Sequence, residues 1–132
     1  MREIKFKGFI KDKRKIAKVN AIDFSLEKVR VSYYDKELKN IITETYNFDE
    51  IELAECIGVK DKNGEEIYEG DIVLHPNSNT TACVLWCNEI SGFHLFKTAK
   101  PKSKNDRLVF AIHELTNLEV IGNIYESPEL LK

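Results

Sequence analysis

Short runs of apolar and β-branched residues, bounded by turn residues, recur along most of this chain, while helical periodicity is weak. This pattern is typical of a β meander or a small barrel. We therefore predict a mainly β fold, with an α+β fold as the alternative. The predicted strands are Ile4–Ile10, Ile16–Phe24, Lys28–Tyr34, Ile41–Tyr46, Ile67–His75, Thr81–Cys87, Phe93–Thr98, Leu108–Ile112 and Leu118–Tyr125.

Two short helices are also predicted. The first covers Phe48–Glu55, with Asn47 as its N-cap. The second lies at the C-terminus, where Ser127 would cap the helix and Pro128 would take the first helical position.

The clearest local signal is a hairpin turn between Lys60 and Glu65. Asp61 can accept hydrogen bonds from the turn backbone, and Asn63-Gly64 tolerates positive φ. Gly70 then permits a sharp bend before the next strand, an arrangement that recurs in SH3-like barrels.

These elements suggest a domain organisation. Residues 1–132 are expected to form a single compact unit, with an N-terminal β meander and short helix in 1–55, an SH3-like barrel in about 56–126, and a short C-terminal helix in 127–132.

Three segments carry a family resemblance: Arg2–Phe9, Gly58–Val73 and Glu119–Leu131. Together they resemble the YopX family of phages and prophages, although Gly8-Phe9 replaces the family's Ala-Trp pair, and residues 75–117 carry no match. The resemblance implies a phage or prophage context. It implies no assigned biochemical function and no catalytic residue, so the matching positions are interpreted as architectural. They are Asp61, Asn63, Gly64, Ile67, Tyr68, Gly70, Asp71, Gly122, Asn123, Tyr125 and Pro128.

Composition places the chain among globular proteins, with 42% hydrophobic and 32% charged residues in 132. Its longest apolar run, Ala82–Cys87, is far shorter than the roughly 20 residues of a membrane-spanning helix. Residues 1–18 lack the apolar stretch of a signal peptide, and three cysteines do not make a disulfide framework. We expect a protein of the bacterial host cytosol that contacts no membrane.

Charge is unevenly distributed along the sequence. Residues 1–20 carry eight Lys or Arg against two acids, and residues 97–107 carry five cations against one acid. Residues 44–71 carry ten acids against two lysines. The formal net charge of −2 therefore hides two basic stretches and one acidic stretch.

No residue pattern predicts catalysis, a cofactor or a small-molecule substrate, so the chain is not expected to be an enzyme. Cys83 and Cys87 would lie about 13 Å apart on a strand, too far to share one zinc ion. Alternation would place both on one strand face with Leu85, as core residues. His75, His94 and His113 stand apart from other ligand residues.

The acidic residues between Asp61 and Asp71 are interpreted as a solvated rim rather than a metal site, because they fit no calcium-loop pattern. Their convergence in a cleft would reopen the possibility of an enzyme.

The basic stretches favour a non-catalytic binding module. A cationic loop beside Trp86, Phe93 and Phe96 would attract a phosphate backbone, with base stacking on any exposed ring. The predicted nucleic-acid contacts are Lys97, Lys100, Lys102, Lys104 and Arg107 in this loop, and Lys11, Lys13, Arg14 and Lys15 in a second basic turn.

Two alternatives to nucleic-acid binding stay open. In the first, the lysines only keep exposed turns soluble and strand edges unpaired. Alternatively, the acidic and basic segments could meet between molecules, giving a homo-oligomer or an interaction module for a host or phage protein.

Overall fold

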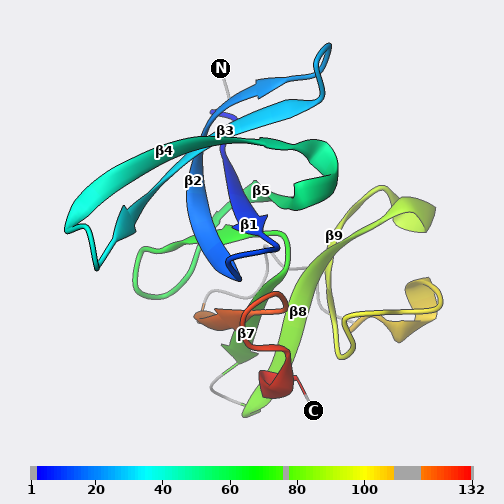
Figure 1. Cartoon of the computed structure of the whole chain (residues 1–132). Helices are drawn as coiled ribbons and strands as arrows, with labels where there is room; N and C mark the ends of the chain where they lie inside the picture. The colour runs from blue at the N-terminus through cyan, green and yellow to red at the C-terminus, as the bar shows by residue number, and fades with distance from the viewer. Residues whose placement is uncertain (1–2, 76–77, 109–116, 132) are drawn as a thin grey trace. The chain divides into compact units, whose positions relative to one another are not determined.

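A computed structural model describes residues 3–75, 78–108 and 117–131 (Figure 1). The chain divides into two compact units, Met1–Glu55 and Cys56–Lys132. The division falls at the boundary expected between residues 55 and 56, while a single compact unit over 1–132 stays a prediction. No helix of the described residues is long and apolar enough to cross a membrane.

The first unit is an antiparallel sheet with strand order β4-β3-β2-β1-β5. Successive hairpins join its first four strands, and the register of β2 against β3 shifts between Val19 and Ala21. The strands are β1 (Phe6–Ile10), β2 (Lys15–Asp23), β3 (Lys28–Asp35), β4 (Asn40–Asn47) and the first half of β5 (Ile51–Lys60).

One face of this sheet holds the core of the first unit. Along β3, Val29, Val31 and Tyr33 are buried, and they cluster with Ile10 and Ile51. The alternate β3 residues point to the opposite face. Burying each of the large aliphatic side chains stabilises the unit by about 1.5–3 kcal/mol.

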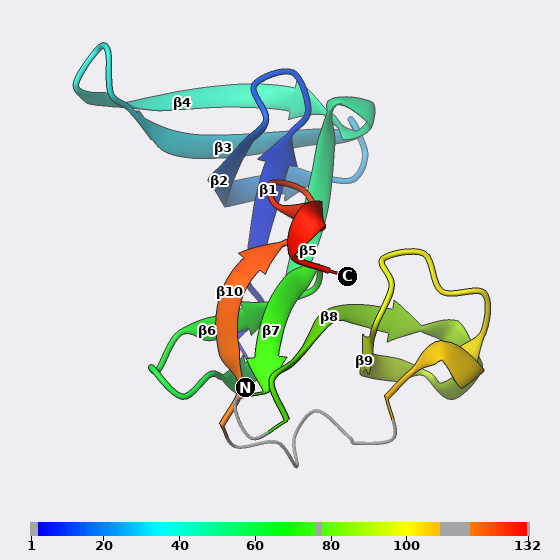
Figure 2. The same cartoon turned by 90° about the horizontal axis from the view of Figure 1, so that it is seen from below.

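The second unit contains a four-stranded antiparallel sheet with strand order β10-β7-β8-β9, most of which is visible in Figure 2. The second half of β5 pairs with β6 in this unit. The strands are β6 (Glu66–Tyr68), β7 (Asp71–His75), β8 (Thr80–Cys87), β9 (Gly92–Phe96) and β10 (Glu119–Asn123).

Both faces of the four-stranded sheet are packed. One face presents a cluster that joins Ile67 and Leu118, and the other presents a cluster against which Ile124 and Leu130 pack. The sheet residues of the first cluster are Val73, Ala82, Val84 and Leu95; those of the second are Ile72, Cys83, Cys87 and Phe96.

The mainly β prediction is confirmed, since antiparallel strands dominate the described residues. The ladders described for the second unit have open edges, so an SH3-like barrel over about 56–126 stays a prediction. Of the predicted strand Leu108–Ile112, all but Leu108 lies outside the described residues.

The predicted helix Phe48–Glu55 is wrong beyond Glu50. Phe48–Glu50 forms one 3-10 turn, in which a Glu50 side-chain oxygen accepts the Asn47 N–H at 2.7 Å. Residues 51–55 instead form the start of β5, because they pair along the full length of β1. Pairing between segments some 45 residues apart outweighs the weak local preference for helix.

The C-terminal prediction is confirmed in part. Pro128–Leu130 forms a single 3-10 turn with Pro128 in the first position, but the Ser127 side chain does not cap it. The Ser127 carbonyl instead accepts the Leu130 N–H at 3.1 Å.

The predicted strand Ile67–His75 is two strands, β6 and β7, separated by a bend at Gly70. Gly70 has φ of +89°, and its N–H donates to the Val84 carbonyl at 2.7 Å. A Cβ atom built there would lie 2.7 Å from Cε2 of Tyr125. Two separate constraints therefore favour glycine at this bend.

We predict that Gly70→Ala destabilises the second unit more than Gly64→Ala does. Both positions have positive φ, which costs a non-glycine residue about 1–2 kcal/mol, but a Cβ at Gly64 meets nothing within 4 Å. The contact with Tyr125 should add about 1–3 kcal/mol at Gly70. Urea denaturation followed by Trp86 fluorescence measures the difference, and equal losses would contradict it.

Candidate nucleic-acid interface

The predicted basic loop, Lys97–Arg107, follows strand β9 and has a defined backbone (the yellow segment in Figure 1). The Lys102 N–H donates to an Asp106 carboxylate oxygen at 2.7 Å, and the Ser103 hydroxyl accepts the Asn105 N–H at 3.2 Å. The Lys104 N–H donates to a Glu89 carboxylate oxygen at 2.9 Å. These contacts close one 3-10 turn, Lys104–Asp106, and fix the loop to the 3-10 turn that follows β8.

The cations of this loop have different surroundings. The Arg107 guanidinium donates to the Lys104 carbonyl at 2.9 Å. Burial, followed by the charge of Arg107, lowers the pKa of His94. The lysine side chains are exposed, and within the described ranges they form no ion pair with a carboxylate; they are Lys97, Lys100, Lys102 and Lys104.

Trp86, near the end of β8, exposes an aromatic ring in the same unit as the basic loop. Trp86 is 46% exposed, packs edge-on against Phe93 with ring centroids 5.2 Å apart, and donates its indole N–H to Asn88 at 2.7 Å. Asn88 begins the 3-10 turn Asn88–Ile90, whose Glu89 holds the loop backbone. Phe96 is buried in the core, so it offers no ring face on which a base could stack.

The second predicted cluster, the basic turn of Lys11, Lys13, Arg14 and Lys15, belongs to the first unit. The Lys11 ammonium donates to the Asp49 carbonyl at 2.9 Å and lies 3.6 Å from Glu52. The Lys15 ammonium donates to the Tyr34 carbonyl and lies 4.6 Å from the centre of the Tyr33 ring. These lysines tie strands of their own unit together.

Lys13 belongs to a network around one carboxylate oxygen of Glu44. That oxygen accepts hydrogen bonds from Lys13 at 2.7 Å, from the Tyr33 hydroxyl at 2.6 Å and from the Tyr46 hydroxyl at 2.8 Å. The bond from Lys13, followed by those from the two tyrosines, lowers the pKa of Glu44 to about 2. The bond to Glu44 likewise raises the pKa of Lys13.

The interpretation of Asp61 and Asp71 as solvated rim residues is wrong, because both are buried. Asp61 accepts hydrogen bonds from the backbone N–H groups of Asn63, Glu65 and Val120 at 2.8 to 3.1 Å. Burial opposes ionisation of Asp61, but these three bonds outweigh it and lower the pKa of the carboxyl. Among the described residues no three His, Cys, Asp or Glu side chains are placed to hold a metal ion.

Asp71 supports the bend at Gly70, because its carboxylate accepts the Tyr68 N–H at 2.8 Å. A similar bond pattern follows β10. The Asn123 side-chain oxygen accepts the N–H groups of Tyr125 at 3.0 Å and Glu126 at 2.8 Å. Asp61, Asp71 and Asn123, three of the positions singled out in the sequence, thus accept backbone N–H groups of tight turns through their side chains.

The central and C-terminal segments that carry the family resemblance meet in space. Besides the bond from Val120 to Asp61, the Lys62 N–H donates to the Leu118 carbonyl at 2.8 Å, and the Lys62 ammonium lies 3.3 Å from Glu119. Gly122 lies close to Leu130, since a Cβ built there would be 2.7 Å from Cδ1 of that leucine.

The cysteines of β8 lie on one face of the strand with Leu85, as alternation predicts. Cys83 donates its thiol to the Thr98 carbonyl at 3.3 Å, and burial raises the pKa of this thiol to about 11. Of the three histidines, His113 lies outside the described residues.

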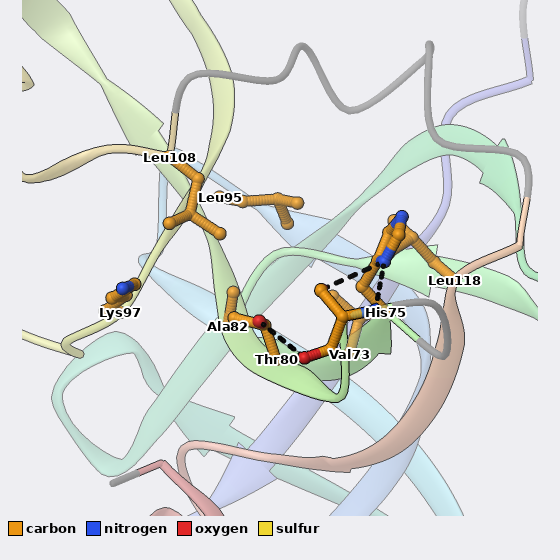
Figure 3. A pocket seen from close by; sticks show the side chains of 9 residues that line it. Val73, His75, Thr80, Ala82, Leu95, Lys97, Leu108 and Leu118 are labelled. Carbon is orange, nitrogen blue, oxygen red and sulfur yellow. Dashed lines mark hydrogen bonds between the residues drawn. The ribbon is translucent and has the colours of Figure 1, made fainter.

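A hollow that the sequence did not predict lies at the start of the basic loop (Figure 3). Its volume is about 230 Å³. The His75 ring nitrogen Nδ1 lies 3.1 Å from the Ser78 hydroxyl and accepts the Ser78 N–H at 3.3 Å. The lining residues come from several strands: Val73, His75, Ser78, Thr80, Ala82, Leu95, Lys97, Leu108 and Leu118.

The chain is similar to a known protein family and to a protein of solved structure. A family model described as YopX protein matches residues 5–132. Among solved structures, protein EF1440 from Enterococcus faecalis is similar, with 21% sequence identity, coverage of 100% of both chains and a TM-score of 0.66, which indicates a shared fold. No protein with a curated description matches the chain.

We predict that Asp61→Asn destabilises the second unit at neutral pH by about 1–3 kcal/mol, because an amide cannot replace a carboxylate that accepts three N–H groups. The folded-state pKa of Asp61 is lowered, so its stabilisation is present above about pH 4 and is lost as pH falls through the folded pKa. Urea denaturation between pH 7 and pH 2, followed by Trp86 fluorescence, should show the two proteins converging at low pH.

A matched control for this experiment is Asp12→Asn, which removes a carboxylate from an exposed turn of the first unit. It should leave the transition reported by Trp86 unchanged. A constant gap between the Asp61 variant and the wild type at every pH would contradict the electrostatic account.

Proposed function

Since the chain belongs to the YopX family, which its family model matches over residues 5–132, we propose that it is a phage or prophage accessory protein of the bacterial host cytosol. We propose further that it acts by binding and not by catalysis. Support for a binding role comes from the exposed cations and aromatic ring of the second unit.

The ligand that this surface favours is nucleic acid. The carrying observation is that four exposed lysines lie on one loop whose backbone is held by Glu89, three residues beyond the half-exposed Trp86. Lysines attract the phosphate backbone independently of sequence, and an indole ring offers a face on which an unpaired base can stack. Anchoring by Glu89 lowers the conformational entropy that the loop would lose on binding.

This proposal predicts salt-dependent binding. Fluorescence anisotropy of labelled single-stranded DNA, duplex DNA and RNA, at low and near-physiological salt, should show an affinity that falls steeply as salt rises. Reversing Lys97, Lys100, Lys102 and Lys104 to Glu should abolish binding, because the loop charge changes from attractive to repulsive.

A matched control reverses Lys36 and Lys39, exposed lysines at the tip of the β3–β4 hairpin, and should preserve most of the affinity. Unchanged binding by the four-residue variant would remove the loop from the proposal. Absence of binding by the wild type at low salt would overturn nucleic-acid binding as a whole.

A second candidate function is protein interaction or self-assembly, and one observation favours it. The tip of the β3–β4 hairpin carries three large apolar side chains in solvent: Tyr34 is 54% exposed, Leu38 67% and Ile41 66%. Tyr34 and Ile41 pair directly across the two strands. Clustered apolar side chains of this kind mark interaction sites more often than singly exposed ones.

Self-assembly through the apolar hairpin tip would depend little on charge. Lys11 and Lys13, from the basic N-terminal stretch, already pair with Glu52 and Glu44 within one unit. An apolar contact at the hairpin tip should therefore persist at high salt, where charge-driven assembly weakens. Light scattering of the wild type and of the Leu38→Asp variant at two salt concentrations measures this. A monomer under all conditions would remove self-assembly.

A further inference from the structure

The sheet face opposite the core of the first unit is exposed along β3, which the sequence did not single out. Along β3, the residues that alternate with the buried core positions point outward, and Lys28, Arg30 and Tyr34 are exposed. We call this the outer face. Strands β2, β3 and β4, which carry this face, are labelled in Figure 1. It also includes Lys18 of β2, Ser32 of β3, and Thr43 and Thr45 of β4.

The outer face is cationic and lined with hydroxyl groups. Arg30 lies opposite Thr45 of β4, and Ser32 lies opposite Lys18 on one side and Thr43 on the other. Lys28 and Arg30 are two residues apart on one strand, which places their Cα atoms about 6.8 Å apart. Lys18 adds a third positive charge on the neighbouring strand, diagonal to Arg30.

A hollow of about 310 Å³ opens on this face between β2, β3 and β4. Its acidic member, Asp23, is already engaged, because its carboxylate accepts the Leu26 N–H at 2.9 Å and shapes the β2–β3 turn. The other polar residues that line the hollow, Lys28, Arg30 and Thr45, each carry a hydrogen-bond donor. The lining residues are Ala21, Asp23, Leu26, Lys28, Arg30 and Thr45.

We propose that the outer face binds a single strand of nucleic acid. In this arrangement Lys18, Lys28 and Arg30 contact phosphates, the hollow receives part of one nucleotide, and Tyr34 stacks on a base. Charge complementarity selects a polyanion, because the outer face carries the three cations Lys18, Lys28 and Arg30, and its carboxylate, Asp23, already accepts a hydrogen bond. A sheet face with an exposed aromatic ring suits unpaired bases, whose faces a duplex hides.

The ligand class of this inference rests on the function proposed above, but its residues do not. The basic loop belongs to the second unit and the outer face to the first. The two surfaces therefore contribute separately to the salt dependence of binding, and each can be removed without touching the other.

The test is the double variant Lys28→Glu and Arg30→Glu in the full chain, measured by anisotropy with labelled oligothymidine and oligouridine. Affinity at low salt should fall at least about tenfold, and the slope of log affinity against log salt should decrease by about 1.4, because each phosphate contact on a single strand contributes about 0.7. Tyr34→Ala should weaken single-strand binding about tenfold while leaving the salt slope unchanged.

Controls separate this inference from the proposed function. The Lys36→Glu and Lys39→Glu variant carries the same charge change outside the outer face and should retain affinity. All of these side chains are exposed, so each variant should keep the wild-type melting temperature. Intact binding by the outer-face variant, with loss in the loop variant, would overturn this inference and leave the proposed loop function standing.

The converse result, loss in the outer-face variant and intact binding in the loop variant, would support this inference and refute the loop. A wild type that binds neither oligonucleotide would overturn both.

Discussion

The carboxylate of Asp61 connects two parts of the chain that are 59 residues apart, and most of the second unit depends on this connection. One oxygen shapes the turn from Asp61 to Glu65, and the other accepts an N–H group from β10. β10 in turn pairs with β7, and the Ile124 N–H beyond it donates to the Gly70 carbonyl. A buried charge is tolerated here because each of its bonds comes from a backbone donor that would otherwise need another partner.

The first unit is stabilised by the same principle with a different residue. Glu44 of the edge strand β4 gathers Lys13, Tyr33 and Tyr46 around one oxygen, which fastens the β1–β2 turn to the β3–β4 hairpin. The charge counts along the sequence predicted basic and acidic stretches that are available to a binding partner. The contacts of Glu44 show that part of this polarity is satisfied inside a single unit, so the remaining candidate surfaces are smaller and more local.

Local features were predictable from the sequence, and features made by distant pairing were not. The Asn63-Gly64 turn, the alternation that buries Cys83 with Cys87, and the one-turn helix at Pro128 each depend on a few neighbouring residues. For Ile51–Glu55 the sequence predicts a helix, because only pairing with β1 makes this segment extended. At the candidate site, the cationic loop was recognisable from composition, whereas its anchoring by Glu89 and the outer face both required the strand register.

The chemical reactivity of the buried Cys83 thiol reports local opening of the sheet in the second unit. With a pKa of about 11 and no solvent exposure, this thiol is almost entirely uncharged and shielded at neutral pH, so alkylating reagents reach it as a thiolate only when the sheet opens. Cys56, which is half-buried, provides a faster-reacting comparison in the same unit. The ratio of the two modification rates therefore measures local opening of the core strand β8 in the unmutated protein.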